Sequence, residues 1–99
     1  MAELEKDIER ALGRMVKRRG GLCLKWVCPG WSGVPDRIVL LPGGRIIFVE
    51  LKRRGGRVSP MQSWWKTTLF KLGFRHIYIW TKTDIDILEG ELELLGVAK

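Results

Sequence analysis

The chain has 99 residues, of which 45% are hydrophobic, and a formal net charge of +7. This length predicts one domain over residues 1–99, and no repeat, linker or low-complexity segment divides it. There is no apolar run long enough for a membrane-spanning helix, and the acidic start is unlike a signal or transit peptide. We therefore expect an intracellular protein whose positive charge suits a polyanionic partner.

The first predicted element is a helix over residues 2–19, which two glycines end. Its apolar stripe consists of Leu4, Ile8, Ala11, Leu12 and Met15. At about 100° per residue, Glu5 lies on the rim of this stripe and Glu9 lies further from it. Glu5 could therefore face a site, or it could only favour the positive end of the helix dipole.

Residues 22–28 are predicted to form the first strand, and residues 29–33 a loop that leads to Asp36. Trp31 in this loop could stack on a nucleic-acid base or cap the core, and we favour packing. Cys23 and Cys28 would point to opposite faces of a strand, so we expect two free thiols. A single histidine leaves too few donors for a four-ligand zinc site.

Two acids and a lysine converge in the next segment. Residues 36–41 and 45–52 are predicted strands joined by a Pro-Gly-Gly turn, which makes a hairpin. Side chains alternate along a strand, so Glu50 and Lys52 share one face, and the hairpin returns Asp36 beside them. Two carboxylates, with the main-chain carbonyl of Leu51, offer hard oxygen ligands to Mg²⁺ or Mn²⁺, and Lys52 could orient a water nucleophile. The alternative is a solvated Glu–Lys pair and a turn aspartate.

Ser59, Pro60 and Gln62 predict a capping box at the start of a second helix, which Gly73 ends. The buried face expected for this helix is Met61, Trp64 or Trp65, Leu69 and Leu72. A strand over residues 74–80 follows, in which His76 is expected to be structural. Thr83 is expected to cap a last helix, which Gly90 weakens and whose apolar side is Ile85, Leu88, Leu92 and Leu95.

Basic side chains form two clusters. Arg53, Arg54 and Arg57 lie between the two candidate site segments, so we expect a phosphate-binding loop there, with Ser59 at the following helix start. The second, weaker candidate for DNA contact is Lys17, Arg18 and Arg19. No Gly-rich nucleotide-binding loop of the P-loop type occurs, so no nucleotide cofactor is expected.

Asp36 with Glu50-x-Lys52 resembles the PD-(D/E)xK nuclease superfamily. The surrounding motifs are similar to the VRR-NUC (virus-type replication-repair nuclease) family: Gly33-Val34-Pro35-Asp36-Arg37, Phe48-Val49-Glu50-Leu51-Lys52 and Ser59-Pro60-Met61-Gln62. The likeness runs from the first helix to the strand around Tyr78. It implies an α/β, restriction-endonuclease-like core in the order α-β-β-β-α-β-α with a mixed central sheet.

The resemblance also implies roles for individual residues. Asp36, Glu50 and the Leu51 carbonyl would bind Mg²⁺ or Mn²⁺, and Lys52 would position the nucleophile. Gln62 would be an active-site residue, and a helix-borne acid would complete the metal site. Glu5 is the first candidate for that acid, with Glu9 as the second.

Stand-alone members of this family are similar to Holliday-junction resolvases that act as homodimers. We therefore predict a metal-dependent, structure-specific DNA endonuclease that cuts four-way junctions as a homodimer, using a metal-activated water. A nickase or flap endonuclease is the alternative among enzymes. The alternative from another class is a nucleic-acid-binding module without cleavage, in which the acids are structural.

Overall fold

The structure, a computed structural model, describes residues 5–97. Its elements in chain order are α1 (Glu5–Arg18), β1 (Leu22–Lys25), β2 (Arg37–Leu41), β3 (Arg45–Leu51), α2 (Pro60–Lys71), β4 (Arg75–Ile79) and α3 (Lys82–Leu94). This order confirms the predicted α-β-β-β-α-β-α arrangement. No helix in the described part of the chain is long and apolar enough to cross a membrane.

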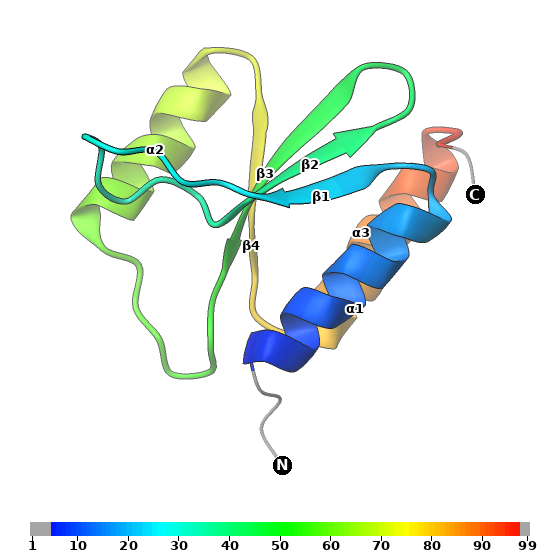
Figure 1. Ribbon diagram of the computed structural model, residues 1–99, viewed down its shortest axis with the longest axis horizontal. Coiled ribbons are helices and arrows are strands. Elements are labelled where there is room, and N and C mark those ends of the chain that lie inside the picture. The colour runs from blue at the N-terminus through cyan, green and yellow to red at the C-terminus, as the bar shows by residue number, and fades with distance from the viewer. Residues whose placement is uncertain (1–4, 98–99) are drawn as a thin grey trace.

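The four strands form one mixed sheet in the order β1-β2-β3-β4. β2 pairs antiparallel with β1 and with β3, whereas β4 is parallel to β3, with α2 as the crossover connection. Figure 1 shows α1 and α3 side by side on one face of the sheet and α2 on the other. The C-terminal end of β3 therefore lies between its neighbouring strands and the first turn of α2.

The main core fills the space between the sheet and the pair formed by α1 and α3. Alternate residues of β3 point into it, namely Ile47, Val49 and Leu51, where they meet buried side chains of both helices. The intervening residues Phe48 and Glu50 point to the other face. The alternation that builds the core thus also delivers Glu50 to the α2 side.

The α2 face carries a cluster of aromatic rings instead of an aliphatic core. Trp26 lies 5.3 Å from Phe48 and 5.6 Å from Trp65 between ring centroids, and Phe48 contacts Phe74 edge-on at 5.5 Å. Edge and tilted contacts of this kind are the favoured arrangements of aromatic side chains. This cluster fixes α2 against the sheet.

Two predicted boundaries are wrong by two residues or more. The first strand ends at Lys25 instead of residue 28. The Trp26 amide still donates to the Asp36 carbonyl, but the chain then leaves the sheet and turns at Pro29 and Gly30. The last helix is capped by Thr81 instead of Thr83: the Thr81 hydroxyl accepts from the Asp84 amide, and the Asp84 carboxylate accepts from the Thr81 amide. The helix therefore starts two residues earlier than expected. The first helix ends at Arg18, and Leu4 of its predicted stripe lies outside the described residues.

The predicted apolar face of α2 is also largely wrong. Only Leu69 is buried, whereas Met61 is 38% exposed and Leu72 is 66% exposed. Trp65 is half-buried and Trp64 is 45% exposed. Leu95, expected inside, is likewise 54% exposed because it caps α3 at its end. A single helix on this face covers the sheet incompletely, since its main strand contact is with β4.

Candidate active site

Asp36 and Glu50 lie directly opposite each other across the β2–β3 ladder. Arg37 pairs with Val49, so the next antiparallel pair outward is Asp36 with Glu50. The Asp36 amide donates to Glu50 Oε1 at 3.2 Å, and the Leu51 amide donates to Asp36 Oδ2 at 2.9 Å. The structure therefore brings Asp36 and Glu50 together, as the predicted hairpin requires.

Glu50 is held in surroundings that disfavour its charge. Its side chain is almost fully buried, with 4% of the residue surface exposed. Burial, followed by the charge of Asp36, raises the pKa of Glu50 to about 7, although Lys52 opposes the shift. A cation bound between the two carboxylates would favour the ionised form of Glu50 and offset its repulsion by Asp36. The pair therefore carries negative charge that the surrounding protein only partly compensates.

Lys52 reaches the same volume from the end of β3. Its Nζ donates to Gln62 Oε1 at 2.8 Å and to the main-chain carbonyl of Arg57. The residue is buried, with 8% of its surface exposed. A buried ammonium fixed by two acceptors can present its remaining proton to a water or a phosphate oxygen without first having to be ordered.

Gln62 connects the acids to the lysine. Its amide nitrogen donates to Glu50 Oε2, and its amide oxygen accepts from Lys52 and, at 3.0 Å, from the Ser59 amide. The Ser59 hydroxyl in turn accepts from the Gln62 amide at 3.1 Å. The predicted capping box is confirmed, and the same side chain that closes it also contacts two candidate site residues.

The donor set fits a divalent cation with hard oxygen preferences. The Lys52 amide bonds Ile79 in β4, so the amide and carbonyl of the preceding residue, Leu51, point the other way, toward Asp36. Two carboxylates and one carbonyl therefore face one edge. Mg²⁺ and Mn²⁺ accept such ligands and retain waters in the remaining positions.

Neither acid of α1 joins this pair in the structure. Glu9 forms an ion pair with Arg37, whose residue is 8% exposed, and Glu5 is exposed at the start of the helix. Within residues 5–97, no three His, Cys, Asp or Glu side chains form a group that could hold a metal ion. The contribution of Glu5 therefore stays a prediction, and Glu9 has a structural partner.

Arg37 is a site-supporting residue that sequence reasoning missed. Its Nη1 donates to the Asp36 carbonyl at 3.0 Å while Nη2 pairs with Glu9. It therefore ties the main chain at Asp36 to α1. Its place directly after the Pro-Asp motif is the only sequence signal that points to it.

The two basic clusters differ in their partners. Arg53, Arg54 and Arg57 are exposed on the loop between β3 and α2, as a phosphate-binding loop requires. In contrast, Arg18 pairs with Glu89 at 2.9 Å, and the buried Arg19 pairs with Glu89 at 2.8 Å and with Glu93 at 3.0 Å. Lys17 is exposed. The second cluster is thus mostly neutralised by α3.

Two smaller predictions concern Cys23, Cys28 and His76. Both cysteines are free, as predicted, and burial raises the pKa of the Cys23 thiol. His76 is 7% exposed and lies edge-on to Tyr78, with ring centroids 5.0 Å apart. It lies in β4 among packed side chains, which agrees with a structural role.

The fold and the paired acids define a small nuclease of the PD-(D/E)xK type. The chain is 45% identical over 75 residues to "Putative nuclease p44" of Acyrthosiphon pisum secondary endosymbiont phage 1. The matched region covers 76% of this chain and 81% of that protein. A solved structure described as "VRR_NUC domain" superposes with a TM-score of 0.80 and 29% identity, covering 85% of this chain and 91% of the other. No family model matches the sequence. The chain belongs to the VRR-NUC family.

Proposed function

We propose that this protein is a metal-dependent DNA endonuclease that recognises branched DNA and cuts four-way junctions as a homodimer. The observation that carries the proposal is the Asp36–Glu50 pair, joined to Lys52 through Gln62. A buried and a half-buried acid that lie beside a fixed ammonium suit phosphodiester hydrolysis. The name of the phage relative, "Putative nuclease p44", supports the same reaction class.

In this proposal Asp36, Glu50 and the Leu51 carbonyl hold Mg²⁺ or Mn²⁺. When bound, such an ion acidifies a water and stabilises charge that develops on the phosphate. Glu50 must be ionised to act as a ligand, and its pKa near 7 makes that state accessible at neutral pH. Lys52 orients the water or the phosphate oxygen. Gln62 fixes the side chains of Glu50 and Lys52 relative to each other through its hydrogen bonds to both.

The loop between β3 and α2 supports DNA as the substrate. Its three exposed arginines follow Lys52 directly, and the Arg57 carbonyl accepts from the Lys52 ammonium. A phosphate bound by this loop would therefore lie close to the paired acids. The chain's net charge of +7 adds a long-range attraction to a polyanion.

The homodimer and the four-way junction rest on symmetry and on surface composition. A two-fold dimer presents two active sites to a substrate that is itself roughly two-fold. Apolar side chains of the edge strand β1 are exposed, with Leu22 at 61% and Leu24 at 45%. Exposed apolar area on a domain of this size is available for association.

The test is cleavage of a labelled four-way junction beside duplex, flap and single-stranded DNA, each with Mg²⁺, Mn²⁺ or EDTA. We expect paired, symmetric nicks in the junction with either metal and none with EDTA. Asp36→Asn is the matched control, because the asparagine keeps the size of the side chain and an acceptor for the Leu51 amide. Cutting of other DNA structures alone would remove the junction from the proposal and leave the nuclease.

Two further results would overturn parts of the proposal. A monomer in sedimentation, both free and on junction DNA, would exclude the paired cut. Absence of cutting under every metal, with DNA binding intact, would make the protein a binding module and the paired acids structural.

A further inference from the structure

Trp31 and Trp64 form a nearly parallel pair of rings on the surface. Their ring planes are 14° apart and their centroids are separated by 6.1 Å. Trp31 remains 56% exposed and Trp64 45% exposed. Large aromatic side chains usually gain stability by burial, so a pair that leaves about half its surface in water is available to a partner.

A third ring holds this pair in place. Trp65 meets Trp31 edge-on at 5.7 Å and Trp64 edge-on at 5.2 Å between centroids. Its indole Nε1 donates to the Ser32 carbonyl at 2.9 Å, which anchors the loop that carries Trp31 to α2. The exposed pair is therefore supported from within the aromatic cluster and is ordered before any partner binds.

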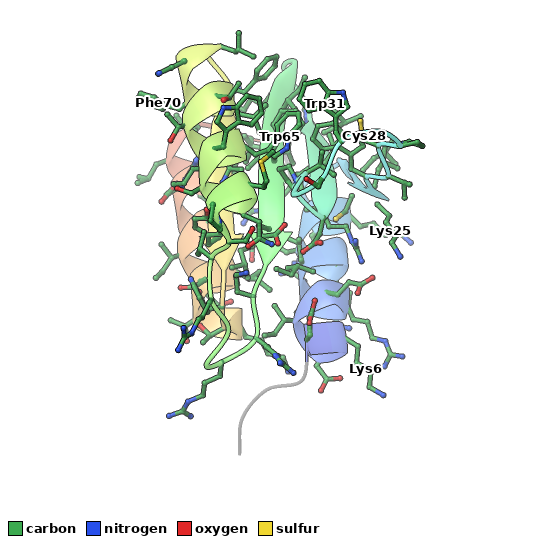
Figure 2. The ribbon with its side chains drawn as sticks, turned by 90° about the vertical axis from the view of Figure 1, so that its left-hand side faces the viewer. Lys6, Lys25, Cys28, Trp31, Trp65 and Phe70 are labelled. Atoms are coloured by element: carbon green, nitrogen blue, oxygen red, sulfur yellow. The ribbon has the colours of Figure 1, made fainter. Side chains whose placement is uncertain are left out.

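The pair lies next to the candidate active site. Gly33 has a φ of +73°, and a Cβ atom there would come within 2.6 Å of Met61 Cβ and 3.2 Å of the Gln62 amide. The loop thus touches the first turn of α2, where Gln62 contacts Glu50 and Lys52. Trp64 belongs to the following turn, about 5 Å further along the helix axis at most. Figure 2 shows Trp31 and Trp65 on the face where α2 meets the sheet.

We propose that Trp31 and Trp64 form a stacking surface for an unpaired DNA base beside the cleaved phosphodiester. Every base has a π-face, and stacking on an aromatic side chain needs no base-specific hydrogen bond. The loop that carries Arg53, Arg54 and Arg57 (the arginine loop) precedes the first turn of α2, and Trp64 follows that turn, so one DNA strand would contact cations before the acids and aromatic rings after them. In continuous duplex, neighbouring base pairs cover each π-face, whereas a branch point exposes some of them. This inference rests on the proposed function and deepens it by assigning the preference for branched DNA to two side chains.

The test measures binding in EDTA, so that it does not depend on cleavage. A labelled four-way junction and a continuous duplex are titrated with the wild type and with the double variant Trp31→Ala/Trp64→Ala. We expect the variant to bind the junction about tenfold more weakly, which is the size of one lost base stack. Duplex affinity should be unchanged. Replacing both tryptophans by Phe should restore most of the junction affinity, because a π-face returns.

Phe70→Ala is the matched control. Phe70 is 77% exposed on the same helix, and Figure 2 shows it on the opposite side of α2 from Trp31. Its loss should leave both affinities unchanged. If the double variant does not fold, as judged by thermal unfolding, the single Trp31→Ala variant on the loop replaces it. A 2-aminopurine base at the branch point, quenched on binding wild-type protein but not Trp31→Ala, gives a second readout.

Three results would overturn the inference. They are an equal loss of junction and duplex affinity, no loss at all, or conversion of a dimer to a monomer by the double variant in sedimentation. The last result would identify the ring pair as a contact between two copies of the chain. If no metal supports cleavage but the tryptophan-dependent preference for the junction persists, the stacking surface stands and only the nuclease proposal fails.

Discussion

The Gln62 amide nitrogen donates to the Glu50 carboxylate from the first turn of α2, so the start of a helix is bonded to the end of a strand. The same amide accepts at its oxygen from Lys52 and from the Ser59 amide. Local helix capping and the geometry of the candidate site therefore depend on one side chain. A change there should affect stability and activity together, whereas loss of the Ser59 hydroxyl should affect mainly stability.

Gln62→Ala should lower the rate of junction cleavage roughly 10- to 100-fold, the range found when a group that orients a metal ligand is removed. It should also lower the free energy of unfolding by about 1 kcal/mol through the lost cap. Ser59→Ala, the control, removes only the hydroxyl that accepts from the Gln62 amide. It should show the same loss of stability, and its cleavage should fall much less than that of Gln62→Ala, because the Gln62 side chain that bonds Glu50 and Lys52 is still present. Equal loss of cleavage in both variants would mean that Gln62 acts only as a cap.

Removal of metal should change the thermal midpoint as well as activity. If Asp36 and Glu50 bind Mg²⁺, saturating metal should raise the midpoint of the wild type, since each kcal/mol corresponds to roughly 4–8 °C in a domain of this size. Asp36→Asn should abolish cleavage, retain DNA binding and show no such rise. Scanning both proteins in Mg²⁺ and in EDTA checks this. A rise of equal size in the variant would place the metal elsewhere.

Local signals in the sequence were sufficient for the hairpin and the helix start that carry the site. Alternation along residues 45–52 predicts the shared face of Glu50 and Lys52, and Ser59-Pro60-x-Gln62 predicts its own capping box. The prediction that Thr83 caps α3 is wrong, and the cap is Thr81, whose Thr81-x-x-Asp84 sequence forms a capping box. The local sequence does not distinguish the two threonines, because Thr83-x-x-Asp86 matches the pattern as well as Thr81-x-x-Asp84 does.

Long-range partners were the part that local patterns could not supply. Arg19 lies 70 residues from Glu89 in the chain, and only the packing of α1 beside α3 makes them neighbours. The pairing of Glu9 with Arg37 depends in the same way on how α1 crosses the sheet. The predicted buried face of α2 is wrong for a related reason. The apolar pattern predicts a face that is covered along the whole helix, whereas the fold covers less of its surface.

The two acids of α1 should respond differently to loss of charge. Glu9→Gln removes the charge that faces buried Arg37 but keeps an acceptor oxygen, so the free energy of unfolding should fall by about 1 kcal/mol. Glu5→Gln should leave stability nearly unchanged, because Glu5 is exposed. If Glu5 completes the metal site, this second variant should also need more Mg²⁺ for half-maximal cleavage. An unchanged Mg²⁺ requirement would remove Glu5 from the site.

The arginine loop should govern the salt dependence of DNA binding. Replacing Arg53 or Arg54 by Ala should weaken binding to all DNA structures alike. The negative slope of log K against log salt should become less steep by about 1. Arg18→Ala is the control, because its charge is already paired with Glu89. It should change the slope less. Fluorescence anisotropy from low to moderate salt measures all three, and equal slopes for wild type and loop variants would exclude phosphate contacts by the loop.

His76 should make the protein less stable in mild acid. Burial, and then the charge of Lys66, lower the pKa of His76 to about 4 from its usual value of 6.5. The folded state thus resists protonation more than the unfolded state does, so this stabilising contribution is complete above pH 6.5 and is lost as the pH falls toward 4. The total loss is about 3 kcal/mol at most.

The measurement compares urea unfolding of the wild type and His76→Phe at several values between pH 7 and pH 4. Phenylalanine keeps an aromatic ring beside Tyr78 but cannot take up a proton. The free energy of unfolding of the wild type should fall more steeply with acid than that of the variant, and the difference should develop below pH 6.5. Carboxylates titrate alike in both proteins, so their contribution cancels in the comparison. Parallel pH profiles would show that His76 is protonated as readily in the folded protein as in the unfolded chain.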